Sequence, residues 1–210
     1  MSHPVSARRL VAVFAVLLAV LAGGCATTSR SPAGSAEWTT YLHEFENGYL
    51  ARNPSFAVGQ GRHEYDGRLP DWSADGIHAD AQWLHAQRAQ AERFDQNTLS
   101  ATQRFERQYL LSRIDTDVFW VEEAQQPFTN PAFYLDGGLD PSVYLTRPYA
   151  PAETRLKAFI NYARAVPTAA AQIRANLRTP LPRSFVKYGV DGFGGFPDFY
   201  RKEVPKPSPR

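Results

Sequence analysis

A single cysteine, Cys25, carries the clearest chemical signature in this chain. Arg8 and Arg9 precede an unbroken apolar run from Leu10 to Ala22, and two glycines separate that run from the cysteine. Basic residues, an apolar run and small residues in this order are typical of a bacterial export signal. The pattern predicts cleavage before Cys25 and lipid attachment to its thiol. One feature departs from the usual motif, because the preferred leucine stands at position 21, one place further from the cysteine.

Two other interpretations of this segment stay open. A retained transmembrane helix needs about 20 apolar residues, and the run from Leu10 to Ala22 is shorter. Simple secretion, with cleavage at another bond, would remove Cys25 or leave a free thiol. Lipidation explains the lone cysteine better, and several acyl chains make a durable anchor. It predicts a signal peptide over residues 1–24 and the membrane as a partner. Because Ala26 is not an aspartate, it also predicts the periplasmic face of the outer membrane in a Gram-negative host.

His63 and Glu64 begin like the zinc motif HExxH, which needs two histidines one helical turn apart and a glutamate as base. Gly67 occupies the place of the second histidine, and glycine and proline interrupt the segment. We therefore predict no metal site here. His63 is interpreted as a loop residue that is hydrogen-bonded to Asp66 or Asp71.

The remaining polar groups show no recognisable catalytic pattern. His78 and His85 are seven residues apart and share a helix face, but they lack a third ligand. Glu122 and Glu123 are adjacent, so their side chains point about 100° apart on a helix. The glycines of DGFGGF follow no strand, and no lysine with an adjacent serine or threonine comes after them, which favours a turn over a phosphate loop. We predict no catalytic residue, cofactor-binding residue or metal ligand in this chain, and Cys25 as its lipidation site.

Three tyrosines, Tyr134, Tyr144 and Tyr149, lie close together in the sequence with Asn130 and Arg147. One interpretation is a polar cleft lined by these side chains. The preferred interpretation is an aromatic loop that packs against helices.

The charge and cysteine content exclude several classes of protein. Removing residues 1–24 takes away two of the 23 basic residues and none of the 21 acidic residues, so the formal charge becomes zero. Without excess positive charge or a basic stripe, we predict no nucleic-acid partner. With one cysteine, the chain forms no internal disulfide and no cysteine-based zinc site. About 185 residues suffice for one domain with a sizeable core.

Apolar residues at helical spacing predict several helices. The first covers residues 37–52, after a polar tether over 25–36. The second begins at Ser73, with a buried stripe of Ile77, Ala81, Leu84 and Ala91. The third begins at a capping box of Ser100 and Gln103, carries a stripe of Leu111, Ile114, Val118 and Val121, and ends before Pro127.

Prolines and glycines divide the rest of the chain. Five prolines from Pro127 to Pro151 exclude a long helix and predict an ordered, aromatic-rich connection. Pro151 begins a helix and Pro167 opens another. The last segment, from Ser184 to Tyr200, begins a helix that breaks at its glycines. With no strand pattern of useful length, the predicted fold class is all-α over residues 37–210.

Several blocks together resemble one bacterial family. They are LARNPSFAVGQGRHEYDGRLPDWS, a helix pair, FWVEEAQQPFTNPAFYLDG, YLTRPYAPAETRL and IRANLRTPLPRSFV, in this order. They are similar to the opening region of the proteins called domain of unknown function 885, many of which are exported lipoproteins. The likeness spans about Tyr41 to Tyr200.

The resemblance implies a largely helical fold that continues for several hundred residues in relatives. Their later part carries an HExxH-like element that implies a zinc metallopeptidase, with zinc as a cofactor of full-length relatives only. This chain contains no HExxH. The predicted function is therefore a membrane-anchored lipoprotein fragment, part of a larger helical fold and inactive alone. An exposed apolar face is expected near its final residues, where the remainder would dock.

Two alternatives are kept. The first is a complete, non-enzymatic envelope lipoprotein that binds a peptide, a cell-wall component or a protein partner. The second is a small hydrolase that uses His63 with Asp66 or Asp71. Unchanged hydrolytic activity after His63→Ala would eliminate the second.

Overall fold

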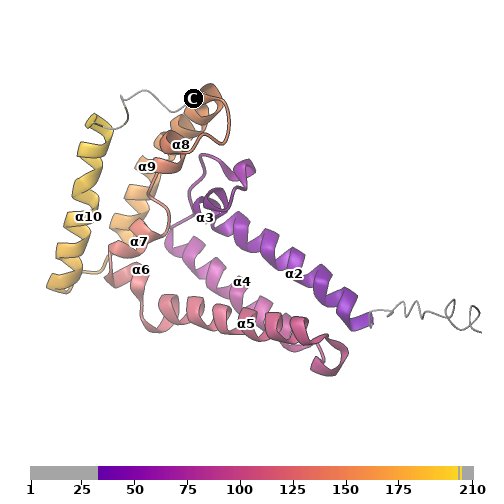
Figure 1. Ribbon diagram of the computed structural model, residues 1–210. Helices are drawn as coiled ribbons and strands as arrows, with labels where there is room; N and C mark the ends of the chain where they lie inside the picture. The colour runs from indigo at the N-terminus through magenta and orange to yellow at the C-terminus, as the bar shows by residue number, and fades with distance from the viewer. Residues whose placement is uncertain (1–32, 203, 205–210) are drawn as a thin grey trace, which may run out of the picture. The chain divides into compact units, whose positions relative to one another are not determined.

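The computed structural model describes residues 33–202 and residue 204, so Cys25 and the apolar run before it lie outside the described residues. Every regular element in the described part is helical, which confirms the all-α class (Figure 1). The long helices are α2 (Ala33–Arg52), α4 (Ala74–Glu92), α5 (Ala101–Val118), α9 (Ala152–Asn176) and α10 (Arg183–Lys202). The short helices are α3 (Pro54–Gly59), α6 (Gln126–Thr129), α7 (Ala132–Asp136) and α8 (Ser142–Thr146). Two 3-10 turns, η1 (His63–Tyr65) and η2 (Gln96–Thr98), and a π-helical turn, η3 (Phe119–Glu123), complete the order.

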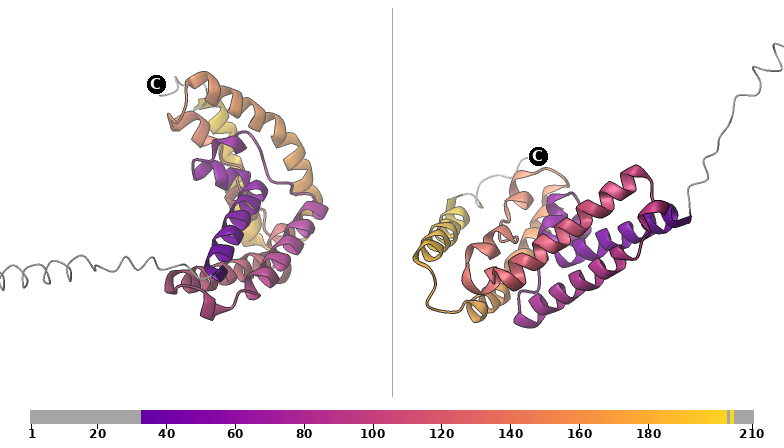
Figure 2. Two further views of the ribbon diagram at one scale, coloured as in Figure 1. Left: turned by 90° about the vertical axis from the view of Figure 1, so that its right-hand side faces the viewer. Right: turned by 90° about the horizontal axis from the view of Figure 1, so that it is seen from below.

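Helices α2, α4 and α5 lie side by side and form what we call the three-helix layer (Figure 2). Its core is one apolar cluster, made of Trp38, Tyr41, Phe45, Leu84, Ala91, Leu99, Leu110 and Ile114. Trp38 is fully buried; its ring meets Phe94 edge-on at 5.3 Å, and its Nε1 donates a hydrogen bond to Glu106 at 2.9 Å. Burial of this much aromatic surface is a large stabilising contribution.

The predicted helix starts of α4 and α5 are confirmed. Ser73 caps α4 by accepting a hydrogen bond from the Gly76 amide, and Ser100 forms the expected capping box with Gln103. These caps satisfy amides that have no partner inside the helix. The predicted stripe of α4 is buried at all four positions.

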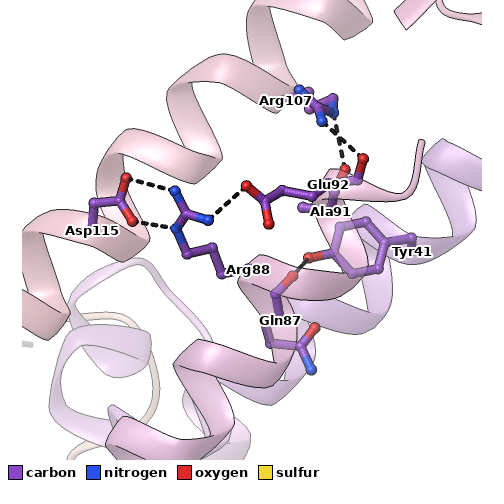
Figure 3. A network of polar contacts seen from close by, with 7 residues as sticks. All are labelled: Tyr41, Gln87, Arg88, Ala91, Glu92, Arg107 and Asp115. Atoms are coloured by element: carbon purple, nitrogen blue, oxygen red, sulfur yellow. Dashed lines mark hydrogen bonds and ion pairs between the residues drawn. The ribbon is translucent and has the colours of Figure 1, made fainter. Parts of the chain in front are cut away.

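Polar contacts tie α4 to α5 at the surface of the layer (Figure 3). Arg88 donates to Asp115 of α5 at 2.6 Å and to Glu92 of its own helix at 2.6 Å. Arg107 donates to the carbonyl oxygens of the last two residues of α4, at 2.9 and 3.1 Å. Cations at this end of a helix pair with carbonyls that lack an intrahelical partner.

Helix α2 begins at Ala33, four residues before the predicted start at Glu37. The physical reason is tertiary, since Ser35 is buried and donates a hydrogen bond to Gln103 of α5 at 2.7 Å. The last residues of the predicted tether are therefore helical.

The predicted helix start at Pro167 is wrong, because α9 continues through this proline to Asn176. Proline removes one intrahelical hydrogen bond and crowds the preceding turn. Here Pro167 is exposed, while Tyr162, Ala169 and Ile173 are buried on both sides of it. Packing of the flanking turns holds the helix together.

The predicted break at the glycines of the last segment is also wrong, because α10 runs through them, and DGFGGF is helical rather than a turn. A Cβ added at Gly189 would lie 2.5 Å from Cγ of Pro131, and one added at Gly192 would overlap Leu135. Glycine at these two positions lets α10 pack closely on the α7 region, which stabilises a helix of weak intrinsic propensity.

The proline-rich connection forms α6, α7 and α8, which confirms that it is ordered and contains no long helix. Arg155 of α9 is buried and fixes the end of this connection. Its side chain donates to the carbonyl oxygens of Tyr144 and Ala150, each at 3.0 Å. No described helix is long and apolar enough to cross a bilayer.

Candidate functional site

A cleft of about 870 Å³ separates the three-helix layer from the proline-rich connection. This volume lies within the roughly 300–1,000 Å³ that is usual for ligand sites. Its aromatic and charged lining residues are Tyr49, Phe56, Trp72, Trp83, Trp120 and Phe133, and Arg52, Asp71, Asp80, Arg113, Asp117, Asp140 and Arg147. The cleft therefore offers both signs of charge and broad apolar surface.

Arg52 and Asp80 form the first ionic group of the cleft. The Arg52 Nε lies 3.2 Å from Asp80 Oδ1, and the guanidinium lies 4.3 Å from the centre of the Trp83 ring. The Nε atom is buried and lacks hydrogen-bond geometry, so the contact with Asp80 is an ion pair of poor alignment. Burial raises the pKa of Asp80, and the charge of Arg52 opposes that rise.

Arg113, Asp117 and Tyr49 form the second ionic group. Arg113 reaches both carboxylate oxygens of Asp117, at 3.1 and 3.0 Å, and donates to the Tyr49 hydroxyl at 3.0 Å. Burial raises the pKa of Asp117 and of Tyr49, while Arg113 acts in the opposite direction on both. This group links α2 to α5 at the wall of the cleft.

The charged residues on the opposite wall of the cleft, Asp140 and Arg147, make fewer polar contacts. Asp140 accepts a hydrogen bond from the Ser142 amide at 2.9 Å, and Arg147 donates to the Gly59 carbonyl at 3.4 Å. Within the described residues, neither lies in an ion pair. Their charges are available to a ligand.

The π-helical turn η3 shapes one end of the cleft. Helix α5 gives way to η3 at Phe119, and this turn places Trp120 and Val121 in the lining. Trp120 remains about half exposed (47%), so its ring offers a stacking surface. Single π-turns within helices occur frequently at functional sites.

His63 contacts Asp66, as one of the two sequence alternatives predicts. Its Nδ1 lies 3.1 Å from Asp66 Oδ1, and its ring stacks on Tyr149 at 3.6 Å. The Tyr149 hydroxyl donates to the other Asp66 oxygen at 2.8 Å. Asp71, the second alternative, lies in the cleft wall and accepts hydrogen bonds from Ser73 and Gln172. These hydrogen bonds, chiefly those from Ser73, hold the pKa of Asp71 below its ordinary value.

The other histidines of the sequence analysis do not meet. His78 contacts Gln82 on its own helix, whereas His85 lies 3.0 Å from Glu122. Both histidines are exposed, as expected of a solvated face. Over residues 33–202 and 204, no group of three or more potential metal ligands is placed to hold an ion.

Of the five residues proposed for a polar cleft, only Asn130 and Arg147 line it. Tyr134 is fully buried and donates to the Pro127 carbonyl at 2.6 Å, and Tyr144 accepts from the Gly67 amide at 2.9 Å. The preferred interpretation, packing of an aromatic loop, is confirmed for these two tyrosines.

Sequence reasoning missed the two ionic groups of the cleft. Arg113 and Asp117 are four apart on a helix, a spacing that predicts a side-chain pair. Arg52 and Asp80 come from different helices, and nothing in their spacing indicates the contact.

Two comparisons with known proteins give a match, one to a family and one to a solved structure. The family model described as "Bacterial protein of unknown function (DUF885)" matches residues 54–206. A solved structure from Shewanella oneidensis, described as a putative lipoprotein of unknown function, is similar with a TM-score of 0.68 and 15% sequence identity. The match covers 80% of this chain and 32% of the other, so the chain spans about a third of that protein's length. No curated protein sequence matches.

Proposed function

Because this chain belongs to the DUF885 family of bacterial proteins of unknown function, we propose that it is the amino-terminal region of an exported, membrane-anchored lipoprotein of the metallopeptidase-like type. Its cleft binds a peptide, while the metal ligands and general base belong to a later region that this sequence does not contain. The chain is catalytically inactive alone. Cys25 anchors it, and the similar Shewanella protein is described in the same terms, as a lipoprotein.

The composition of the cleft carries the peptide-binding part of this proposal. A peptide presents main-chain donors and acceptors, two charged ends and apolar side chains. Arg147 complements a carboxylate, and Asp140 complements an amine, because neither is already in an ion pair. Trp120 and Phe133 supply apolar contact area.

Peptide binding is tested by calorimetry with the mature chain and the pentapeptide Lys-Phe-Ala-Leu-Ala. We expect saturable binding that Arg147→Ala weakens about tenfold, the effect of one lost charged hydrogen bond. The carboxy-terminal amide of the same peptide should bind wild type as weakly as the free acid binds the variant. Arg93→Ala, at an exposed arginine outside the cleft, is the control and should change nothing. Absence of saturable binding of the free acid to wild type contradicts the proposal.

Anchoring is tested separately by cell fractionation. Wild type should sediment with membranes and incorporate labelled palmitate, whereas Cys25→Ala should lose the label. Unaltered labelling of the variant would rule out Cys25 as the lipid attachment site.

The alternative function is a finished, non-enzymatic lipoprotein whose cleft binds a peptide, a cell-wall component or a protein partner. Sequencing the encoding DNA beyond codon 210 separates the two. Helical sequence with HExxH in any forward frame supports the fragment, and unrelated sequence supports the alternative.

A further inference from the structure

A second cavity, of about 490 Å³, lies between α9 and α10 and shares no lining residue with the cleft. We call it the apolar groove. Side chains that line it include Val166, Ile173 and Leu177 on the α9 side, and Val190, Phe193 and Phe196 on α10. Arg174 is the only charged residue in the lining.

The volume of the apolar groove limits what it can hold. One turn of a helix about 10 Å wide and 5.4 Å high fills roughly 420 Å³, so the groove cannot enclose a helix of several turns. A methylene group is about as large as a water molecule, whose share of liquid volume is about 30 Å³, so there is room for roughly sixteen such groups. A single long acyl chain fits this volume.

Arg174 supplies a charge at the groove. It is exposed, and within the described residues it takes part in no ion pair. The acidic residues of α10 do not oppose an anion, because Asp191 and Asp198 are paired with Lys187 and Lys202. The local charge at Arg174 therefore favours an anionic head group.

The groove is also open to entry. Val186 and Val190 line it and remain exposed, so an acyl chain reaches it without displacing a buried side chain. Burial of each methylene contributes about 0.8 kcal/mol, which makes affinity depend on chain length.

We propose that the apolar groove binds a free long-chain fatty acid, with its alkyl chain between α9 and α10 and its carboxylate on the Arg174 guanidinium. This site is independent of peptide binding, since the two cavities have no residue in common. Arg174 binds the carboxylate but takes no part in chemistry.

The probe is palmitate below its aggregation limit, with calorimetry on the mature chain. We expect saturable one-to-one binding that Arg174→Ala weakens about tenfold. Hexadecanol, which lacks the charge, should bind wild type and Arg174→Ala equally. Arg164→Ala, at an exposed arginine of the same helix that does not line the groove, is the matched control and should bind palmitate normally.

A second variant fills the groove instead of removing its charge. Ala170 lines the groove and is exposed, so Ala170→Phe places a ring in the cavity without disturbing a buried core. It should abolish binding of both probes while the far-ultraviolet circular dichroism spectrum stays unchanged. Absence of palmitate binding by wild type overturns the proposal, as does binding that both variants leave intact. Dimers that Ala170→Phe disrupts, without palmitate binding, assign the groove to a second copy and overturn it too.

Discussion

The three-helix layer and the α9–α10 pair differ in how completely they bury their apolar side chains. Helix α2 buries Trp38, Tyr41, Phe45 and Leu50 against its neighbours, and polar contacts close the edges of that layer. Helix α10 has one buried residue, Gly189, and leaves an apolar groove beside α9. Val186 and Val190, which are four residues apart on one face of α10, remain exposed. The first region buries its large apolar side chains, whereas the second leaves several of its apolar side chains exposed.

The largest expected effect is in the core of the three-helix layer. Trp38→Ala should lower the free energy of unfolding by about 3–5 kcal/mol, because it removes a fully buried ring. Urea denaturation measures the loss. The control is Phe105→Ala, at an exposed ring of α5, which should cost no more than about 0.5 kcal/mol. Equal costs at the two positions would contradict the burial of Trp38 in the core of the layer.

A smaller effect is expected where α9 faces the connection. Asn176 is buried, and its side-chain amide donates to the Trp72 carbonyl at 2.6 Å and to the Tyr134 hydroxyl at 2.9 Å. Asn176→Ala should cost about 1–3 kcal/mol, since it leaves buried acceptors unpaired. Thermal unfolding of this variant beside Asn161→Ala, an exposed position on the same helix, checks the prediction. A loss of thermal stability in Asn161→Ala but not in Asn176→Ala would contradict the burial of this face of α9.

Two glycines of α10 should respond with opposite signs. Gly189→Ala drives a methyl group against the rigid Pro131 ring and should destabilise the protein. Gly194→Ala meets nothing within 4 Å and should stabilise the helix by about 0.5–1 kcal/mol. Differential scanning calorimetry gives both shifts in melting temperature. The same sign for both would argue against close packing of α10 on the α7 region.

The smallest effect is a pH dependence at the cleft. Burial raises the pKa of Asp117 above its ordinary value of 3.8, so the folded state holds this proton more tightly than the unfolded state. The resulting stabilisation is fully present below pH 3.8 and is lost as the pH rises through the raised pKa. The free energy of unfolding of wild type minus that of Asp117→Asn should therefore fall over this interval. A difference that rises with pH would mean that the ion pair with Arg113 outweighs burial.

Features that depend on near neighbours in the chain were predictable. The capping box of Ser100 and Gln103, the buried stripe of α4 and the ordered connection follow from spacing alone, and the structure confirms each. The family membership was recognisable from ordered sequence blocks, and the family model confirms it. The export signal and lipidation of Cys25 remain predictions.

Tertiary structure decided the features that the sequence predicted wrongly or missed. Helix α9 continues through Pro167 because packing of the flanking residues outweighs weak local propensity. Helix α10 continues through its glycines because Gly189 and Gly192 let it pack closely on Pro131 and Leu135. The ion pair of Arg52 with Asp80 depends on which faces of α2 and α4 meet. Spacing and caps are set by residues three or four apart and can be read from the sequence. A cleft or a groove arises from contacts between distant segments, so only the assembled fold fixes its shape and charge.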